Sequence, residues 1–119
     1  MSLEKNLKKG YAALKITDSV FIHRQASEFK KAFSEFRAQG ISNFAVDLTE
    51  CSYISSEGLA AVAEMWNWCH EKENGRFALA LSTEPGNEIR YLFDIIGLSV
   101  AMNGYIFSSA GEAESSVSG

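Results

Sequence analysis

"AVDLTECSYISSEGLAAV", from Ala45 to Val62, is the stretch that decides the fold of this chain. It starts as a short apolar run, which is typical of a buried strand, and it ends with apolar residues at helical spacing. Ser55 and Ser56 stand where the first pattern gives way to the second. A buried strand that leads into a helix is the repeating unit of α/β folds.

The same two patterns continue on both sides of this stretch. Short apolar runs predict strands at residues 3–9, 10–16, 43–50, 77–81 and 104–109. Helical spacing predicts helices at residues 26–36, 55–71 and 85–96, and an Asn74-Gly75 turn is expected after the second. Gly40 and Gly97 are natural stops for the first and third helices.

This alternation predicts an α/β fold with a mixed, mostly parallel sheet of four to five strands joined by helical crossovers. Nothing in the sequence indicates a linker, so residues 1–119 are expected to form a single domain. Residues 112–119 are small and polar, and we expect them to be a disordered tail.

The composition argues against several classes of partner. The chain carries a formal net charge of −4 and no run rich in Lys or Arg, so nucleic acid is not predicted as a partner. Membrane insertion is not predicted either, because no apolar run approaches the ~18 residues of a membrane span. Cys51 and Cys69 are too few for a disulfide framework and are expected to be reduced, buried thiols. With no signal peptide at the N-terminus, these features predict a cytoplasmic protein.

Capping explains one of the two serines. Ser55 suits the N-cap of the second helix, where its hydroxyl accepts a hydrogen bond from the amide of Glu57 or Gly58. Glu57 then lies in the first turn, where the helix dipole favours a carboxylate. Ser56 would be the first helical residue, and capping leaves it unexplained.

Catalysis at Ser56 is not predicted. The Gly-x-Ser-x-Gly elbow is absent, His70 lies about 20 Å farther along the same helix, and His23 cannot be placed from the sequence. Glycine-rich phosphate-binding motifs and metal-ligand spacing are also missing, so neither a cofactor nor a metal is predicted. Regulatory phosphorylation remains as an interpretation of Ser56. The free amides and the dipole at the start of a helix favour an added phosphate, which carries a charge of about −1.5 to −2.

The helix after the serines has apolar residues on two sides. A core stripe is predicted from the residues Leu59, Val62, Ala63, Trp66 and Cys69. Ala61, Met65 and Trp68 fall on nearly the opposite side. Either the helix is sandwiched between other elements, or these three residues form an exposed patch for a partner, in which Trp and Met are typical contacts.

The segment "FAVDLTECSYISSEGLAAVAEM" resembles the signature of STAS domains, specifically the bacterial anti-sigma factor antagonists. Asp47 and Leu48 match the Asp-Leu that ends a buried strand in that family. The residues from Ser56 to Leu59 match its Ser-x-Gly-Leu at the start of a helix.

The resemblance implies a non-enzymatic switch. Ser56 is then phosphorylated by a serine kinase that is also an anti-sigma factor, and a serine phosphatase removes the phosphate. The unmodified protein binds and sequesters the kinase, which frees the sigma factor, and phosphorylation blocks this binding. The expected partner-binding residues are Ser55, Glu57, Gly58, Ala61, Met65 and Trp68.

One position departs from the family pattern. Ser55 stands where the family has an aspartate, so the cap carries no charge, and Ser55 becomes a second candidate for the phosphoacceptor. The alternative is a STAS scaffold subunit of a transporter or of another signalling complex, which binds its partners without being phosphorylated.

Overall fold

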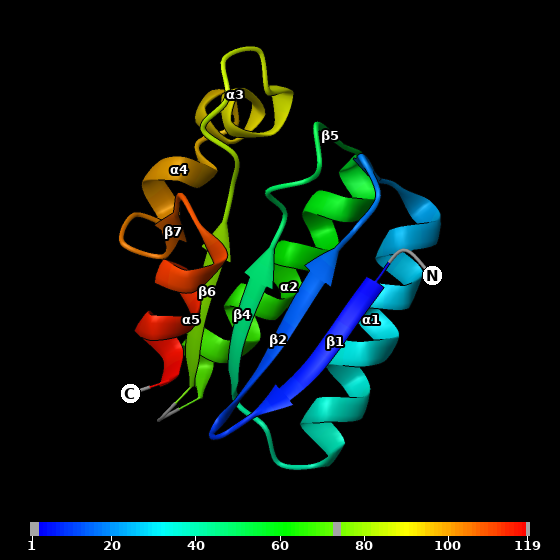
Figure 1. Ribbon diagram of the computed structural model, residues 1–119, viewed down its shortest axis with the longest axis vertical. Coiled ribbons are helices and arrows are strands. Elements are labelled where there is room, and N and C mark those ends of the chain that lie inside the picture. The colour runs from blue at the N-terminus through cyan, green and yellow to red at the C-terminus, as the bar shows by residue number, and fades with distance from the viewer. Residues whose placement is uncertain (1–2, 73–74, 119) are drawn as a thin grey trace.

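A five-stranded sheet organises the structure, a computed structural model that describes residues 3–72 and 75–118 (Figure 1). Its strands, in spatial order, are β1 (Leu3–Lys8), β2 (Tyr11–Ile16), β4 (Asn43–Asp47), β6 (Arg76–Ala80) and β7 (Ile106–Phe107). The first strand pairs antiparallel with β2, and every other neighbouring pair is parallel. The predicted mixed, mostly parallel sheet is therefore confirmed.

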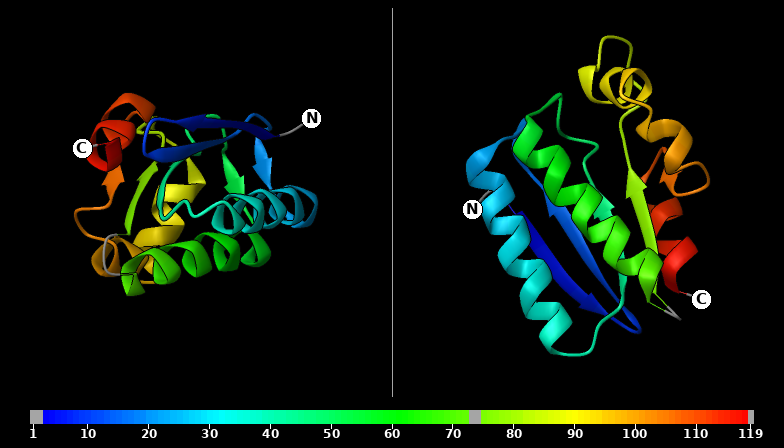
Figure 2. Two further views of the ribbon diagram at one scale, coloured as in Figure 1. Left: turned by 90° about the horizontal axis from the view of Figure 1, so that it is seen from below. Right: turned by 180° about the vertical axis from the view of Figure 1, so that it is seen from behind.

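Two long helices cover one face of this sheet. The helices α1 (His23–Ala38) and α2 (Ser56–Glu71) lie side by side on that face and connect β2 to β4 and β4 to β6 (Figure 2). Two shorter helices, α3 (Glu88–Ile95) and α4 (Leu98–Ala101), lead from β6 to β7. The predicted stop at Gly97 is confirmed by its left-handed backbone, with φ of 82°, directly after the C-cap of α3, Ile96. Of the predicted Asn74-Gly75 turn, Asn74 lies outside the described residues.

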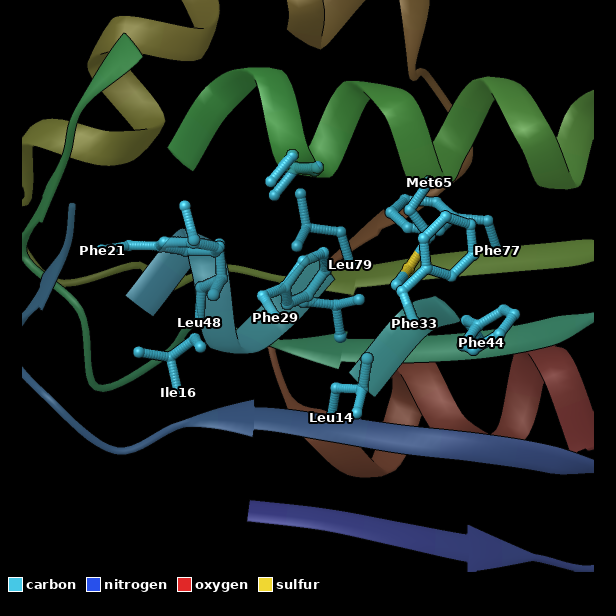
Figure 3. Packing of buried hydrophobic residues seen from close by; sticks show 14 of the residues in the cluster. Leu14, Ile16, Phe21, Phe29, Phe33, Phe44, Leu48, Met65, Phe77 and Leu79 are labelled. Carbon is cyan, nitrogen blue, oxygen red and sulfur yellow. The ribbon is translucent and has the colours of Figure 1, made fainter. Parts of the chain in front are cut away.

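Aromatic side chains from α1 fill the space between the helices and the sheet. Phe29 and Phe33 are fully or almost fully buried, at 0% and 2% exposure (Figure 3). The ring of Phe33 meets the ring of Phe44 from β4 edge to face, with centroids 5.1 Å apart. Such pairs add about 0.5–1.5 kcal/mol to the burial of the rings themselves. This packing fixes α1, and through it the neighbouring α2, against the central strands.

A second, two-stranded sheet lies beyond the carboxyl ends of the main strands. It pairs β3 (Val20–Phe21) with β5 (Tyr53–Ile54) in parallel. Neither strand was predicted, because an element of two residues is too short to show a period in the sequence.

The expected disordered tail is wrong for residues 112–118, which belong to helix α5 (Ala110–Ser118). This helix lies on part of the second face of the sheet, where Ala113 and Val117 are buried against alanines of β4 and β6 (Figure 2). The Tyr11 hydroxyl donates to Glu114 Oε1 over 2.6 Å. Two buried apolar residues four positions apart are enough to hold α5 on the sheet, because the small alanine side chains of the strands let the helix approach closely. Within the described residues, no helix is both long and apolar enough to cross a membrane.

Val117→Asp tests whether α5 is part of the folded domain. Val117 is 1% exposed, so the new carboxylate would be buried without a partner. We expect the free energy of unfolding, measured by urea denaturation, to fall by ~3 kcal/mol. Ser115→Asp on the exposed side of α5 is the matched control, and it should change stability by less than ~0.5 kcal/mol. Equal effects of the two variants would show that α5 does not pack on the sheet.

Candidate functional site

The site is built where two connections run side by side past the carboxyl ends of β2 and β4. The β3–β5 pairing sets Val20 beside Tyr53 and Phe21 beside Ile54. The Ser52 amide extends the pairing by donating to the Ser19 carbonyl over 2.7 Å. Because β3 leads into α1 and β5 leads into α2, this backbone pairing holds the beginnings of the two helices together.

Ser55 is the N-cap of α2, as predicted. Its Oγ accepts a hydrogen bond from the Gly58 amide over 3.2 Å. Both its amide and its hydroxyl donate to the Phe21 carbonyl, over 3.0 and 3.4 Å. The hydroxyl is thus engaged as donor and as acceptor, which makes Ser55 the less suitable of the two serines for modification.

Ser56 is in the opposite situation. It is the first residue of α2, it is exposed, and its hydroxyl makes no hydrogen bond to any residue in the described ranges 3–72 and 75–118. The first amides of a helix have no partner within the helix, and the positive end of the dipole lies there. The geometry suits the predicted phosphoacceptor, whose modification stays a prediction.

Gly58 has a structural role instead of the expected contact with a partner. It is buried, and a Cβ added to it would lie 2.6 Å from the Phe21 carbonyl oxygen and 2.7 Å from Ile54 Cγ1. Any larger residue would force the start of α2 away from β3. The sequence contains the glycine but not this reason for it, because β3 is far away along the chain.

The expected patch of Ala61, Met65 and Trp68 is not an exposed surface. Ala61 and Met65 are 1% and 0% exposed, and Met65 points into the core (Figure 3). Trp68 is partly buried, with its ring edge to face against Phe33 of α1 at 5.5 Å. The alternative of a sandwiched helix is therefore confirmed.

The packing also changes the predicted core stripe of α2. Val62 and Cys69 are buried, but Leu59, Ala63 and Trp66 are only partly so. A helical period gives the angle between side chains around the helix axis, but it does not say on which side each neighbouring element lies. Here α1 lies against one side, the sheet lies beneath, and the segment around Tyr105 meets Trp66 on the other side, with ring centroids 6.2 Å apart.

Five of the exposed residues of α2 form a line along its solvent-facing side. They recur every three or four positions and are Ser56, Ala60, Glu64, Asn67 and Glu71. We call this line the α2 face. It begins at Ser56, so a partner that docks along it would meet that hydroxyl.

Glu57 lies beside the α2 face and reaches the start of α1. Its carboxylate contacts Nδ1 of His23, the histidine that could not be placed from the sequence. Both side chains are mostly exposed, so the pair adds little stability, but it links the first turns of α1 and α2.

A third connection is bound to the same place. Asn87 caps α3 by accepting from the Ile89 amide over 3.0 Å, and its Nδ2 donates to the Cys51 carbonyl over 2.9 Å. The Cys51 thiol donates to the Asp18 carbonyl over 3.3 Å. The connections that follow β2, β4 and β6 are therefore joined by hydrogen bonds at Cys51.

Both cysteines are free and buried, as predicted. Burial raises the pKa of the Cys51 thiol to about 12, and nearby carboxylates, first Asp47, act in the same direction. Burial alone raises the pKa of Cys69 to about 12. In the described part of the chain, no group of three or more His, Cys, Asp or Glu residues is arranged to hold a metal ion.

Solved structures share this arrangement. An anti-sigma factor antagonist from Mycobacterium paratuberculosis superimposes with a TM-score of 0.75 at 16% identity, over 97% of this chain and 92% of the other. The Bacillus cell fate determinant SpoIIAA in its phosphorylated form gives 0.69 at 16% identity, over 95% and 96% of the two chains. Unphosphorylated SpoIIAA, also an anti-sigma factor antagonist, gives 0.65 at 12% identity, over 92% and 91%.

These likenesses show that the chain has the fold of the anti-sigma factor antagonists, the STAS fold. No protein-family model matches the sequence, and no curated protein matches it either. The likeness is thus one of fold, and the expected partners and the modification of Ser56 stay predictions.

Gly58→Ala tests the close approach of β3 to α2. The new methyl group would overlap the Phe21 carbonyl, so we expect the free energy of unfolding to fall by about 1–3 kcal/mol. The matched control is Gly111→Ala in α5, where a Cβ would meet nothing within 4 Å. That change should stabilise the protein by about 0.5 kcal/mol, because it removes backbone entropy from the unfolded chain. A neutral Gly58→Ala variant would contradict the proposed packing.

The thiols should be protected and should make stability depend on pH. Each keeps its proton up to about pH 12 when folded, against an ordinary pKa of 9.0. The contribution of the two raised pKa values to the free energy of unfolding is therefore complete below pH 9.0, and it is lost as the pH rises toward 12. We expect Ellman's reagent at pH 8 to react with both thiols far more slowly in native protein than in urea. Rapid reaction of the native protein would show that the site around Cys51 opens freely.

Proposed function

We propose that this protein is a phosphorylation-controlled binding module that acts in the bacterial cytoplasm as an anti-sigma factor antagonist. The observation that carries the proposal is the division of roles between the two serines. Ser55 is held in the cap by three hydrogen bonds, whereas Ser56 presents an unengaged hydroxyl at the start of an exposed helix face. The shared fold supports it, since SpoIIAA, which has this fold, is known in both a phosphorylated and an unphosphorylated form.

In the unmodified state, the α2 face is suited to bury against a partner. Three of its five residues, Ser56, Ala60 and Asn67, are uncharged and lose little on being removed from water when their polar groups find partners. The carboxylates of Glu64 and Glu71 would need cationic groups on the partner. The proposed partner is a serine kinase that is also an anti-sigma factor. Binding would sequester it and release the sigma factor.

Phosphorylation of Ser56 would make burial of the α2 face against the partner unfavourable. The phosphate adds about −1.5 to −2 charges at neutral pH, and burying it without cationic partners costs several kcal/mol. The carboxylates of Glu57 and Glu64 lie on or beside the same face and would repel it further. Within the free protein the start of α2 would tolerate the phosphate, because unpaired amides point toward it. A serine phosphatase would restore the binding state.

Ser56→Asp tests the switch. We expect wild type, but not Ser56→Asp, to enrich an ATP-binding serine kinase from a lysate of the source organism, with at least about tenfold less recovered by the variant. Ser34→Asp, which changes an exposed serine in the middle of α1, should recover as much kinase as wild type. Equal recovery by all three proteins would contradict the proposal.

The acceptor can be assigned separately by intact-mass measurement of protein isolated from cells. We expect a single phosphate on wild type and on Ser55→Ala, and none on Ser56→Ala. Phosphate that is lost in Ser55→Ala and kept in Ser56→Ala would make Ser55 the acceptor. Unmodified wild type under all growth conditions would instead favour a scaffold subunit that binds without phosphorylation.

A further inference from the structure

Large apolar side chains are exposed mainly in the connections that follow the carboxyl ends of the strands. Among the described residues, those with the largest exposure are Leu7, Ile22, Tyr53, Tyr91, Ile95, Ile96 and Val100. Only Leu7 belongs to a strand of the main sheet, and the others follow β2, β4 or β6 in the chain. Tyr91 and Ile95 are 68% and 61% exposed, one turn apart on α3. Such clustering is typical of an interaction site.

A groove lies between β5 and α3 in this region. It is lined by Tyr53, Ile54, Glu88, Tyr91, Leu92 and Ile95. Its volume is about 260 Å³. A cavity of ~150 Å³ can hold a benzene molecule, so the groove has room for an aromatic or a large aliphatic side chain.

The groove is continuous with the Ser56 site. Tyr53 and Ile54 form its wall on one side, and the same backbone continues directly into Ser55 and Ser56. On the other side, α3 is tied to this connection through Asn87 and the Cys51 carbonyl. A protein that covers Ser56 therefore lies within reach of the groove, and the two surfaces are held in a fixed relation.

The charges around the groove indicate what kind of segment it receives. Glu88 lines it, and Glu84 and Asp94 are exposed on the same connection. The one basic residue between 81 and 103, Arg90, directs its guanidinium to the carbonyls of Leu81 and Ser82, 3.3 Å from each. Glu88 is therefore the only charged side chain among the described residues that line the apolar groove. A second copy docked through this same groove would place Glu88 against Glu88, whereas a segment with Lys or Arg would find an opposite charge.

We propose that this groove is a second docking point for the protein that binds at Ser56, and that it receives an aromatic or aliphatic side chain flanked by Lys or Arg. The inference rests on the proposed function for the identity of that shared partner. The groove acts as an apolar anchor, and the α2 face acts as the part of the interface that phosphate can break.

Site-specific photo-crosslinking in cells tests this arrangement. A benzoylphenylalanine is placed at Tyr91 in the groove, at Ala60 on the α2 face, or at Leu7 on the far edge of the sheet. We expect positions 91 and 60 to capture the same protein and position 7 not to capture it. The peptide attached at position 91 should contain an apolar side chain next to Lys or Arg.

A pair of matched variants measures the contribution of the groove. Ile95→Glu places an acid in it and should reduce capture of the partner at position 60 by about tenfold. Leu7→Glu makes the same kind of change at a residue of similar exposure, 55% against 61%, and should leave capture unchanged. Both side chains are exposed, so neither change should lower the midpoint of thermal unfolding appreciably.

The outcomes separate this inference from the proposed function. Capture of the kinase at position 60 but not at position 91, or full binding by Ile95→Glu, would show that the groove is not a docking point. Either result would still be compatible with the proposed switch at Ser56. Capture of only a second copy at position 91 would also overturn it. Capture at both positions of one shared protein that is not a kinase, with Ser56 unmodified, would support the groove and reject the switch.

Discussion

The carbonyl oxygen of Phe21 is the atom on which the site depends. It accepts hydrogen bonds from both the amide and the hydroxyl of Ser55, and it lies where any side chain at position 58 would have to go. This one backbone group on β3 positions the N-cap residue of α2. It also sets the distance between α2 and β3, and it requires a glycine in the first turn of α2. Ser56 lies between two residues that this carbonyl constrains, Ser55 directly before it and Gly58 two positions after it.

The position of that carbonyl is in turn secured by the core. The side chain of Phe21 is completely buried and packs against Phe29 of α1, with ring centroids 5.4 Å apart. Gln25 holds the start of the same helix by accepting from the Ile22 amide and donating to Asp18. Moving Ser56 would thus require the first helix to move as well. A rigid support of this kind suits a switch in which the chemistry of one side chain changes and its position does not.

Local patterns predicted most of the fold, and contacts distant in sequence account for what they missed. The N-cap at Ser55 and the extent of α2 follow from the type and spacing of neighbouring residues, and both were confirmed. The sides of α2 could not be assigned, because Met65 and Trp68 face elements that a helical period does not locate. His23 contacts Glu57, and Gly58 lies against the Phe21 carbonyl, and both of these partners are more than thirty positions away in the sequence. The last helix was missed because the alanines that receive it lie on two separate strands.

The packing of α5 sets the order in which this protein can be completed during synthesis. Until residues 110–118 have left the ribosome, Tyr11 and the alanines of β4 and β6 have no cover on their side of the sheet. The hydrogen bond between Tyr11 and Glu114 spans 103 positions, so it is among the last to form. A nascent chain that already holds Ser56 and its cap would still expose an apolar strip at its back. Contacts between such strips on neighbouring chains favour aggregation, so α5 protects the folded domain as well as stabilising it.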